Sequence, residues 1–232
     1  MKTDFFRRLA EWLKDVFFPM RCPFCGRVME RSAVCCSGCL PKLPRTDPEK
    51  ACPRCGKQQC SCGGVPLLTS TRSSFYYEGC ADFAVQRLKF GHRPGAAIPL
   101  GRIMAGTVRE EGTAWDLITA IPMTRRKVRR RGYNQSELLA GSMAKELGIP
   151  YAPVLHKIRE TRAQHTLDAR ARAKNLSGAY RADPEAEGKR ILICDDVLTT
   201  GATLREAASA LLQAGAKEVG AVTLCSVERD RS

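Results

Sequence analysis

Apolar and polar positions along the chain follow two kinds of pattern, and their order predicts the fold. Two continuous apolar runs, at 116–121 and 191–194, are typical of buried parallel strands, and further strands are predicted at 73–77 and 219–227. Apolar residues at helical spacing predict helices at 80–90, 96–109, 133–147 and 203–214. Strands that alternate with helices favour an α/β fold, with a parallel sheet flanked by helices on both faces.

An amphipathic helix is predicted before this α/β part. In the range 5–17 apolar residues recur at helical spacing, with basic and acidic residues between them, and Pro19 ends the pattern. Such a helix either lies in a membrane surface or docks on its own domain. The mixed signs on its polar face favour docking, because interfacial membrane helices have a mainly cationic polar face.

Residues 20–65 have a different composition from the rest of the chain. They are poor in apolar periodicity and rich in Cys, Pro and Gly. A segment this short cannot bury enough apolar surface to fold without a staple, that is, a cross-link such as a bound metal ion or a disulfide. We therefore divide the chain into an N-terminal helix at 1–19, a stapled module at 20–65 and an α/β domain at 66–232.

Paired cysteines supply the staple. Nine of the twelve cysteines lie between Cys22 and Cys62. A CxxC turn presents two thiolates to one metal ion, and two such turns complete a closed tetrahedral zinc site. The pattern predicts two structural zinc sites, in a small double zinc ribbon: Cys22, Cys25, Cys36 and Cys39 form the first, and Cys52, Cys55, Cys60 and Cys62 the second.

Two alternatives bear on these zinc sites. A redox-active CxxC is one, but four cysteine pairs within about forty residues favour zinc. The other concerns the ligand set, because Cys35 precedes Cys36 and competes for the same position. The short spacing of Cys60 and Cys62 also leaves the geometry of the second site open.

The charge balance favours anionic partners. The formal net charge is +14, which is typical of proteins that bind nucleic acid, phosphorylated metabolites or anionic membranes, although a basic surface can also be merely solvated. No apolar run reaches the roughly 18–20 residues of a membrane-spanning helix. Acidic residues at Asp4, Glu11 and Asp15 interrupt any secretory signal, so we expect a cytoplasmic protein.

The richest motif follows the apolar run at 191–194. Asp195 and Asp196 precede a hydroxyl-rich loop that contains Gly201, and a helix follows. Small residues let backbone N–H groups approach a phosphate closely, and a helix N-terminus favours negative charge. Two carboxylates beside such a cradle are explained if they accept hydrogen bonds from ribose hydroxyls or orient hydrated magnesium. A simple helix cap would account for only one of these residues.

This segment resembles the motif of type I phosphoribosyltransferases that binds 5-phosphoribosyl-1-pyrophosphate (PRPP). The resemblance rests on four apolar positions, Asp-Asp and Thr-Thr-Gly-Ala-Thr. It implies that Asp195 and Asp196 are catalytic residues that contact the ribose of Mg²⁺-bound PRPP. It also implies a cradle for the 5-phosphate made of Thr199, Thr200, Gly201, Ala202 and Thr203.

A wider resemblance covers nearly the whole chain. Together with the cysteine knuckles, the elements Leu88-Lys89-Phe90, Arg131-Gly132-Tyr133-Asn134-Gln135 and Arg162-Ala-Gln164 are similar to the ComF family of competence proteins. The resemblance implies a zinc-ribbon module before a type I phosphoribosyltransferase-like domain, and a role in DNA uptake during natural transformation. The implied partners are PRPP, single-stranded DNA and a competence helicase or another DNA-processing protein.

A basic cluster follows the strand predicted at 116–121. Six of the seven residues at 125–131 are cationic, and Arg131 and Gly132 are candidates for contact with the pyrophosphate of PRPP. The remaining cations exceed what one pyrophosphate needs, so we assign them to a nucleic-acid backbone, with a solvated basic loop as the alternative. They are Arg125, Arg126, Lys127, Arg129 and Arg130.

The polar stretch at 157–175 is long for a compact α/β domain and predicts a functional loop or hairpin. Arg162, Gln164 and His165 are expected to lie on this flexible loop and to close over bound PRPP, excluding water.

Three functions fit these motifs. The first is a competence factor that binds PRPP and single-stranded DNA. The second is a phosphoribosyltransferase that transfers phosphoribose to a nucleobase or another small acceptor and releases pyrophosphate. The third is a regulatory domain that senses PRPP without turnover. The surplus of cations and the zinc module favour the first.

Overall fold

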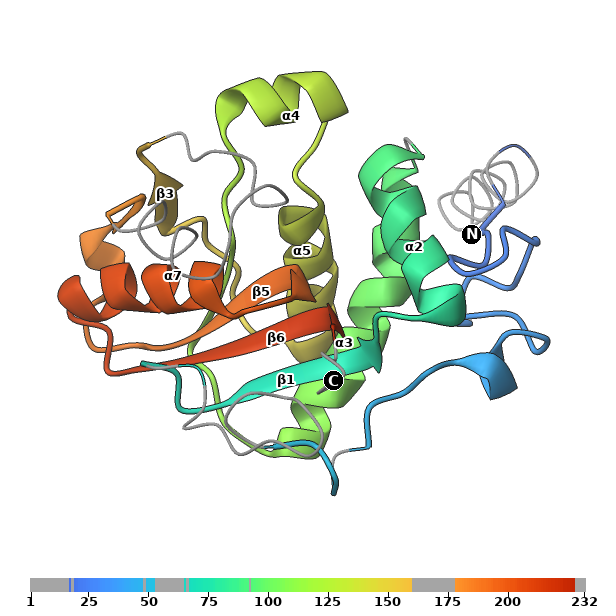
Figure 1. The fold of residues 1–232 in the computed structure, drawn as a ribbon, viewed down its shortest axis with the longest axis horizontal. Coiled ribbons are helices and arrows are strands. Elements are labelled where there is room, and N and C mark those ends of the chain that lie inside the picture. Colours follow the sequence, from blue (N-terminus) through green and yellow to red (C-terminus); the bar gives the residue numbers. More distant parts are fainter. Residues whose placement is uncertain are drawn as a thin grey trace, which may run out of the picture.

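The computed structural model describes residues 19–47, 49–52, 67–91, 93–159 and 178–227, together with Phe17 and Val65 (Figure 1). Several predictions therefore lie outside the described residues. They are the helix at 5–17 except Phe17, the zinc ligands Cys55, Cys60 and Cys62, and the loop residues Arg162, Gln164 and His165.

A four-stranded parallel sheet forms the centre of the molecule, in the order β1-β6-β5-β2. Its strands are β1 (Thr71–Tyr76), β2 (Leu117–Ala120), β5 (Arg190–Leu198) and β6 (Glu218–Ser226). All four were predicted within a few residues, and the parallel pairing confirms the expected α/β class. The central strands β5 and β6 are buried on both faces, which is why their sequences are almost continuously apolar.

Helices cover both faces of this sheet. Helices α3 (Ala97–Glu111) and α5 (Gln135–Leu147) pack on one face, and α7 (Ala202–Gln213) packs on the other. Alternate residues of β5 enter the two resulting cores: Leu192 and Cys194 on the α3–α5 side, Ile191 and Ile193 on the α7 side. Single-turn 3-10 helices occur at Leu40–Lys42, Pro94–Ala96 and Pro184–Ala186. Among the described residues, no helix has the length and apolar character needed to cross a membrane.

Helix α2 (Gly79–Phe90) connects the sheet to the cysteine-rich module, which it borders in Figure 1. Its inner side chains, among them Val85 and Leu88, share one buried cluster with Phe24 of the module. The Phe24 ring meets the Phe75 ring of β1 edge-on, with 5.6 Å between the ring centroids. The module and the sheet therefore share a continuous hydrophobic core.

Two predictions of secondary structure were wrong: the end of one strand and the conformation of the basic segment. The strand expected to end at Cys194 continues to Leu198, because β6 pairs with it along the whole length, including Asp195 with Thr223. The basic segment expected to be a loop is a helix, α4 (Arg125–Arg131). Arg and Lys are good helix formers, the Thr124 side chain caps the first turn, and Gly132 ends the helix with a φ of 90°.

A small antiparallel ribbon, β3 (Leu155–Lys157) with β4 (Tyr180–Ala182), brackets the polar stretch. It was not predicted, because strands of three residues leave no measurable alternation. The pairing brings Lys157 and Tyr180 opposite each other in the ribbon.

Candidate functional site

The acid pair lies in the carboxyl-terminal half of β5. Asp196 is 5% exposed and Asp195 is partly exposed, and both follow the fully buried run of the same strand. In open parallel sheets, ligands bind beyond the carboxyl ends of the strands. The pair is therefore in the position where a fold of this type holds its ligand.

Three elements bring polar side chains to this pair. Ser136 Oγ donates to Asp195 Oδ1 at 2.9 Å, and Gln135 Nε2 donates to Asp196 Oδ2 at 2.9 Å. Lys89 Nζ, from the last turn of α2, lies 3.1 Å from the same Asp196 oxygen. The first turn of α5, the end of α2 and β5 therefore converge on two adjacent carboxylates.

The start of α5 is built to hold its two donors in place. Asn134 caps the helix: its side-chain oxygen accepts from the Ser136 N–H at 3.1 Å, and its amide donates to the carbonyl of Ile121 at 3.0 Å and to Glu137 at 2.9 Å. Asn134, Gln135 and Ser136 are all buried. Because the cap ties α5 to the end of β2, the donors reach the acid pair in a fixed orientation.

Arg131 contacts one of these donors, Gln135. Its guanidinium donates to Gln135 Oε1 and stacks over the Phe90 ring, 5.3 Å from the ring centroid. The Tyr133 hydroxyl donates to the carbonyl of Leu88 at 2.7 Å. The Leu88–Phe90 and Arg131–Gln135 elements, distant in sequence, are thus neighbours in the fold.

The two adjacent carboxyl groups of the site do not ionise equally. Burial, followed by the adjacent Asp196 carboxylate, raises the pKa of Asp195 to about 7. Burial also lowers the pKa of Arg131, which the Asp196 carboxylate partly offsets. Within the described part of the chain, Lys89 is the one cation at ion-pair distance from the pair. Hydroxyl groups that donate to these carboxylates, or a hydrated divalent cation beside them, would favour the charged form of both, so the residues present fit ribose and Mg²⁺.

The hydroxyl-rich loop at 199–203 connects β5 to α7. Gly201 begins the helix with a φ of 74°, and a Cβ there would lie 2.8 Å from a Val65 methyl group. Both facts favour glycine at this position. The Ala202 N–H donates to Thr200 Oγ1 at 3.4 Å. The loop places the positive end of the α7 dipole at the same end of the sheet as the acid pair, where an anion would be stabilised.

Helix α4 presents the predicted basic cluster to solvent. Arg125, Arg126, Lys127, Arg129 and Arg130 are all exposed. Figure 1 shows α4 standing apart from the layers that cover the sheet. Arg131, in its last turn, is the member of the run that turns toward the acid pair, whereas the other five remain available to an external partner.

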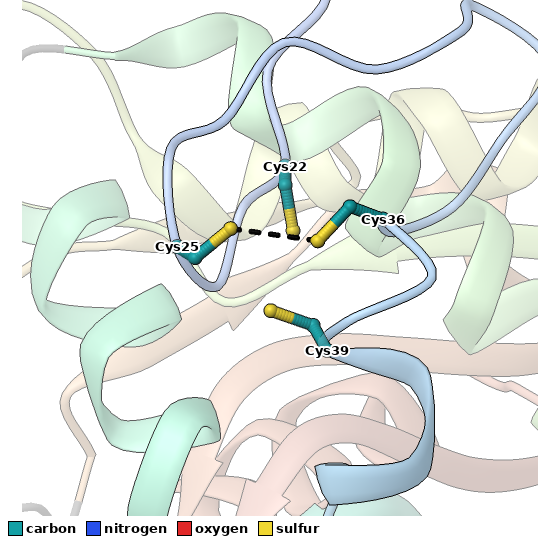
Figure 2. Close-up of side chains that lie close together, drawn as sticks. All are labelled: Cys22, Cys25, Cys36 and Cys39. Atoms are coloured by element: carbon teal, nitrogen blue, oxygen red, sulfur yellow. Dashed lines mark hydrogen bonds between the residues drawn. The ribbon is translucent and has the colours of Figure 1, made fainter.

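The first predicted metal site is assembled by four cysteines. The sulfurs of Cys22, Cys25, Cys36 and Cys39 all lie within 4.8 Å of one another, and those of Cys25 and Cys36 are 3.5 Å apart (Figure 2). Tetrahedral zinc with Zn–S bonds of about 2.3 Å requires sulfurs about 3.8 Å apart, so the cluster fits zinc.

The backbone explains this convergence. The Gly26 N–H donates to the carbonyl of Cys22 at 2.8 Å, and Gly26 turns the chain with a φ of 83°. In the second knuckle, the Cys39 N–H donates to the carbonyl of Cys36 at 3.0 Å. A hydrogen bond with Cys25 lowers the pKa of Cys36 to about 7, toward the thiolate form that zinc binds.

Cys35 is not part of the cluster. It is buried in the hydrophobic core, and burial raises its pKa. The structure therefore favours Cys36 over Cys35 as the ligand. Of the second predicted set, only Cys52 is described; it packs against the α7-side core. Outside the cysteine-rich module, Cys194 and Cys225 are fully buried and Cys80 is partly exposed.

Sequence reasoning gave no role to Lys89, Gln135 or Ser136. The first two lie in the elements that carried the family resemblance, but their contacts with the acid pair are long-range. One local signal was present. Asn134 and Glu137 have the spacing of a helix-capping pair, which marks where α5 begins.

Comparisons with known proteins agree with this architecture. A family model described as "Double zinc ribbon domain" matches residues 13–81, and one described as "Phosphoribosyl transferase domain" matches residues 134–232. Competence protein F of Haemophilus influenzae is 28% identical over 224 residues, 88% of this chain and 95% of the relative. The DNA utilization protein YhgH of Salmonella typhimurium is 33% identical over 210 residues, 88% of this chain and 89% of the relative. The chain belongs to the ComF family.

This membership confirms the predicted order of a zinc-ribbon module before a type I phosphoribosyltransferase-like domain in the ComF chain. Solved structures are also similar to parts of it. The glutamine PRPP amidotransferase of B. subtilis has a TM-score of 0.39 at 25% identity, covering 57% of this chain and 26% of that one. UMP synthase of Leishmania donovani has a TM-score of 0.39 at 23% identity, covering 60% and 24%.

Proposed function

We propose that this ComF-family protein binds Mg²⁺-PRPP at the Asp195–Asp196 pair and binds single-stranded DNA in a competence or DNA-utilisation role. The observation that carries the first part is the convergence of Lys89, Gln135 and Ser136 on the two carboxylates. The names of the relatives support the second part, as does the exposed basic helix α4.

Each part of the site has a role in this proposal. Ser136 and the Asp196 N–H hold Asp195 Oδ1, while Gln135 and Lys89 hold Asp196 Oδ2. The carboxylates are therefore oriented before the ribose hydroxyls arrive. The loop at 199–203 and the start of α7 take the 5-phosphate. Arg131 and the Gly132 backbone contact the pyrophosphate, whose charge Mg²⁺ neutralises when bound.

Residues outside the described ranges complete the proposal. Arg162, Gln164 and His165 close over the ligand from the segment between β3 and β4. Cys55, Cys60 and Cys62 join Cys52 in the second zinc site, which accords with the match to a double zinc ribbon.

Calorimetric titration of the full chain with Mg²⁺-PRPP tests the first part of the proposal. We expect saturable binding of Mg²⁺-PRPP at one site. An unlinked mixture of ribose 5-phosphate and pyrophosphate should not bind under the same conditions, because a single linked ligand avoids the entropic cost of ordering two separate molecules. Absence of binding at millimolar PRPP would refute the site.

The phosphoribosyltransferase-domain match supports a second candidate, transfer of phosphoribose to a small acceptor. Pyrophosphate release measured across a panel of nucleobases separates the two functions. Pyrophosphate release that depends on one of the bases would make the protein a phosphoribosyltransferase. Binding of PRPP without pyrophosphate release, whichever base is added, would make it a PRPP-responsive factor.

Helix α4 is the proposed contact surface for DNA, and substitutions in it test that proposal. Arg126→Gln, Arg129→Gln and Arg130→Gln together should weaken binding of labelled oligothymidylate and reduce its salt slope by about 2, because each single-strand phosphate contact contributes roughly 0.7. Anisotropy across a salt series measures both. The matched control changes three exposed cations elsewhere, Lys145, Arg181 and Lys217, to Gln. Equal slopes in the two triple variants would show that only net charge matters.

A further inference from the structure

Helix α2 exposes two large aromatic side chains. Phe83 is 63% exposed and Phe90 is 62% exposed. Seven residues along a helix amount to nearly two full turns, so the two rings lie on one face, about 10 Å apart along the axis. Two rings on one helix face offer two flat apolar surfaces to solvent at this spacing.

A groove of about 630 Å³ is lined by Arg87 of α2, by the segment that leads into α3 and by the first zinc knuckle. Arg87 follows Phe83 by four residues and is therefore on the same side of the helix. The described lining of the groove contains four arginines, Arg21, Arg31, Arg87 and Arg93, and no acidic residue. Its apolar lining includes Met20 and Ile98. The groove therefore combines an apolar surface with a high density of positive charge, and its size is within the range of ligand sites.

Arg87 links the groove to the zinc knuckle. Its Nη2 donates to the carbonyl of Cys25 at 3.3 Å, while its Nη1 is buried and has no hydrogen-bond partner among the described residues. A Cβ at Gly26 would approach Nη1 to 3.1 Å, so glycine keeps the knuckle close to the guanidinium. The guanidinium is thus fixed between α2 and the knuckle, and it keeps a positive charge at the wall of the groove.

The other end of the α2 face reaches the acid pair. Arg131 stacks over Phe90, and Lys89, the adjacent residue, contacts Asp196. The aromatic face of α2 thus extends from the zinc knuckle to the proposed PRPP site.

We propose that α2 and the first zinc knuckle form a track for single-stranded DNA that leads to the PRPP site; this deepens, and rests on, the DNA-binding part of the proposed function. Proteins that hold single strands combine a cationic groove for the backbone with aromatic side chains on which bases stack. Phe83 and Phe90 offer the stacking faces, and the groove arginines offer the phosphate contacts. The absence of described acidic residues in the groove favours a polyanion over a protein partner.

The test measures binding of labelled oligothymidylate to the full, zinc-loaded chain across a salt series. Phe83→Ser should raise Kd about tenfold at every salt concentration without changing the salt slope, since loss of one stacked base costs about that factor. Phe83→Trp should retain the affinity. Arg93→Gln should reduce the salt slope by about 0.7, the contribution of one phosphate contact.

Two variants serve as matched controls. Leu40→Ser removes an exposed apolar side chain elsewhere on the zinc module, where Leu40 is 51% exposed, and Arg181→Gln removes an exposed cation from β4. Both should leave binding unchanged. The proposal is overturned if Phe83→Ser and Leu40→Ser bind within twofold of each other.

The outcomes also separate this inference from the proposed function. If the α4 triple variant loses affinity while Phe83→Ser and Arg93→Gln do not, DNA runs over α4 alone and only the track is wrong. If the unmodified chain binds no oligothymidylate even at low salt, the DNA-binding function itself fails. If Phe83→Ser changes only self-association in sedimentation, the face joins two copies of the chain and the track is again overturned.

Discussion

The double variant Asp195→Asn/Asp196→Asn is expected to lose Mg²⁺-PRPP binding by at least about a hundredfold while remaining folded. Hydrogen bonds to charged acceptors are worth roughly 1.5–3 kcal/mol each, and two carboxylates that hold ribose hydroxyls contribute two or more of them. The uncharged amides also attract magnesium far less. Calorimetric titration of both proteins measures the loss.

Stability should be affected much less than binding in this variant. Burial and the neighbouring Asp196 carboxylate raise the pKa of Asp195, which disfavours its charged form in the folded chain, so Asp195→Asn should cost little stability at neutral pH. At Asp196, Lys89 loses its ion-pair partner but is not fully buried. We therefore expect a thermal midpoint close to that of the unmodified protein.

Asp116→Asn is the matched control for the double variant. Asp116 pairs with Arg190 at the other end of β5, at 2.9 Å, and is remote from the proposed ligand. It should retain full affinity for Mg²⁺-PRPP. Retained affinity in the Asp195/Asp196 double variant would remove the acid pair from the binding site.

The second large effect is expected from the zinc cluster. Cys36→Ser should lose one zinc per chain and unfold the cysteine-rich module, because structural zinc supplies roughly 10–16 kcal/mol of apparent binding free energy in comparable small modules. Cys35→Ser should retain the metal, since Cys35 lies in the hydrophobic core and outside the sulfur cluster. Elemental analysis of purified protein distinguishes the two variants.

Metal content also tests the second site. The unmodified protein should contain close to two zincs and Cys36→Ser close to one. A single zinc in the unmodified protein would contradict the two-site assignment, and equal metal content in the two serine variants would contradict the choice of Cys36.

Loss of zinc should also reduce the stability of the α/β domain. Phe24 lies between two of the ligands and packs on Phe75, a fully buried residue of β1. Chelation should therefore lower the thermal midpoint of the α/β domain as well, which near-ultraviolet circular dichroism can follow. A domain midpoint unchanged by chelation would show that the shared core contributes little.

Sequence patterns predicted the elements whose signals are local. The apolar strands, the four large helices and the cysteine knuckles all follow from periodicity or spacing within short windows. The acid pair was recognised because its strand, carboxylates and glycine loop are contiguous in sequence. The change in composition after the cysteines predicted the order of the two domains, and the family resemblance then implied what each of them is.

The remaining features depend on contacts that no local window contains. Lys89 reaches Asp196 across more than a hundred residues, so its role depends on how α2 packs. The extension of β5 past Asp195 depends on its pairing with β6. Helix α4 depends on a cap and a glycine at its two ends, against the expectation that a dense run of like charge stays a loop.

The linker that follows the first zinc cluster has a consequence for solubility. Strand β1 is an edge strand, and Arg45 forms an antiparallel bridge with Phe75 on its outer side. The Tyr76 N–H donates to the Pro44 carbonyl at 2.8 Å, and the Thr46 N–H donates to the Ser74 carbonyl at 3.2 Å. An uncovered edge is a template for pairing with another chain. The linker thus covers the edge of the sheet, and loss of zinc from the adjoining module is expected to expose that edge to pairing with other chains.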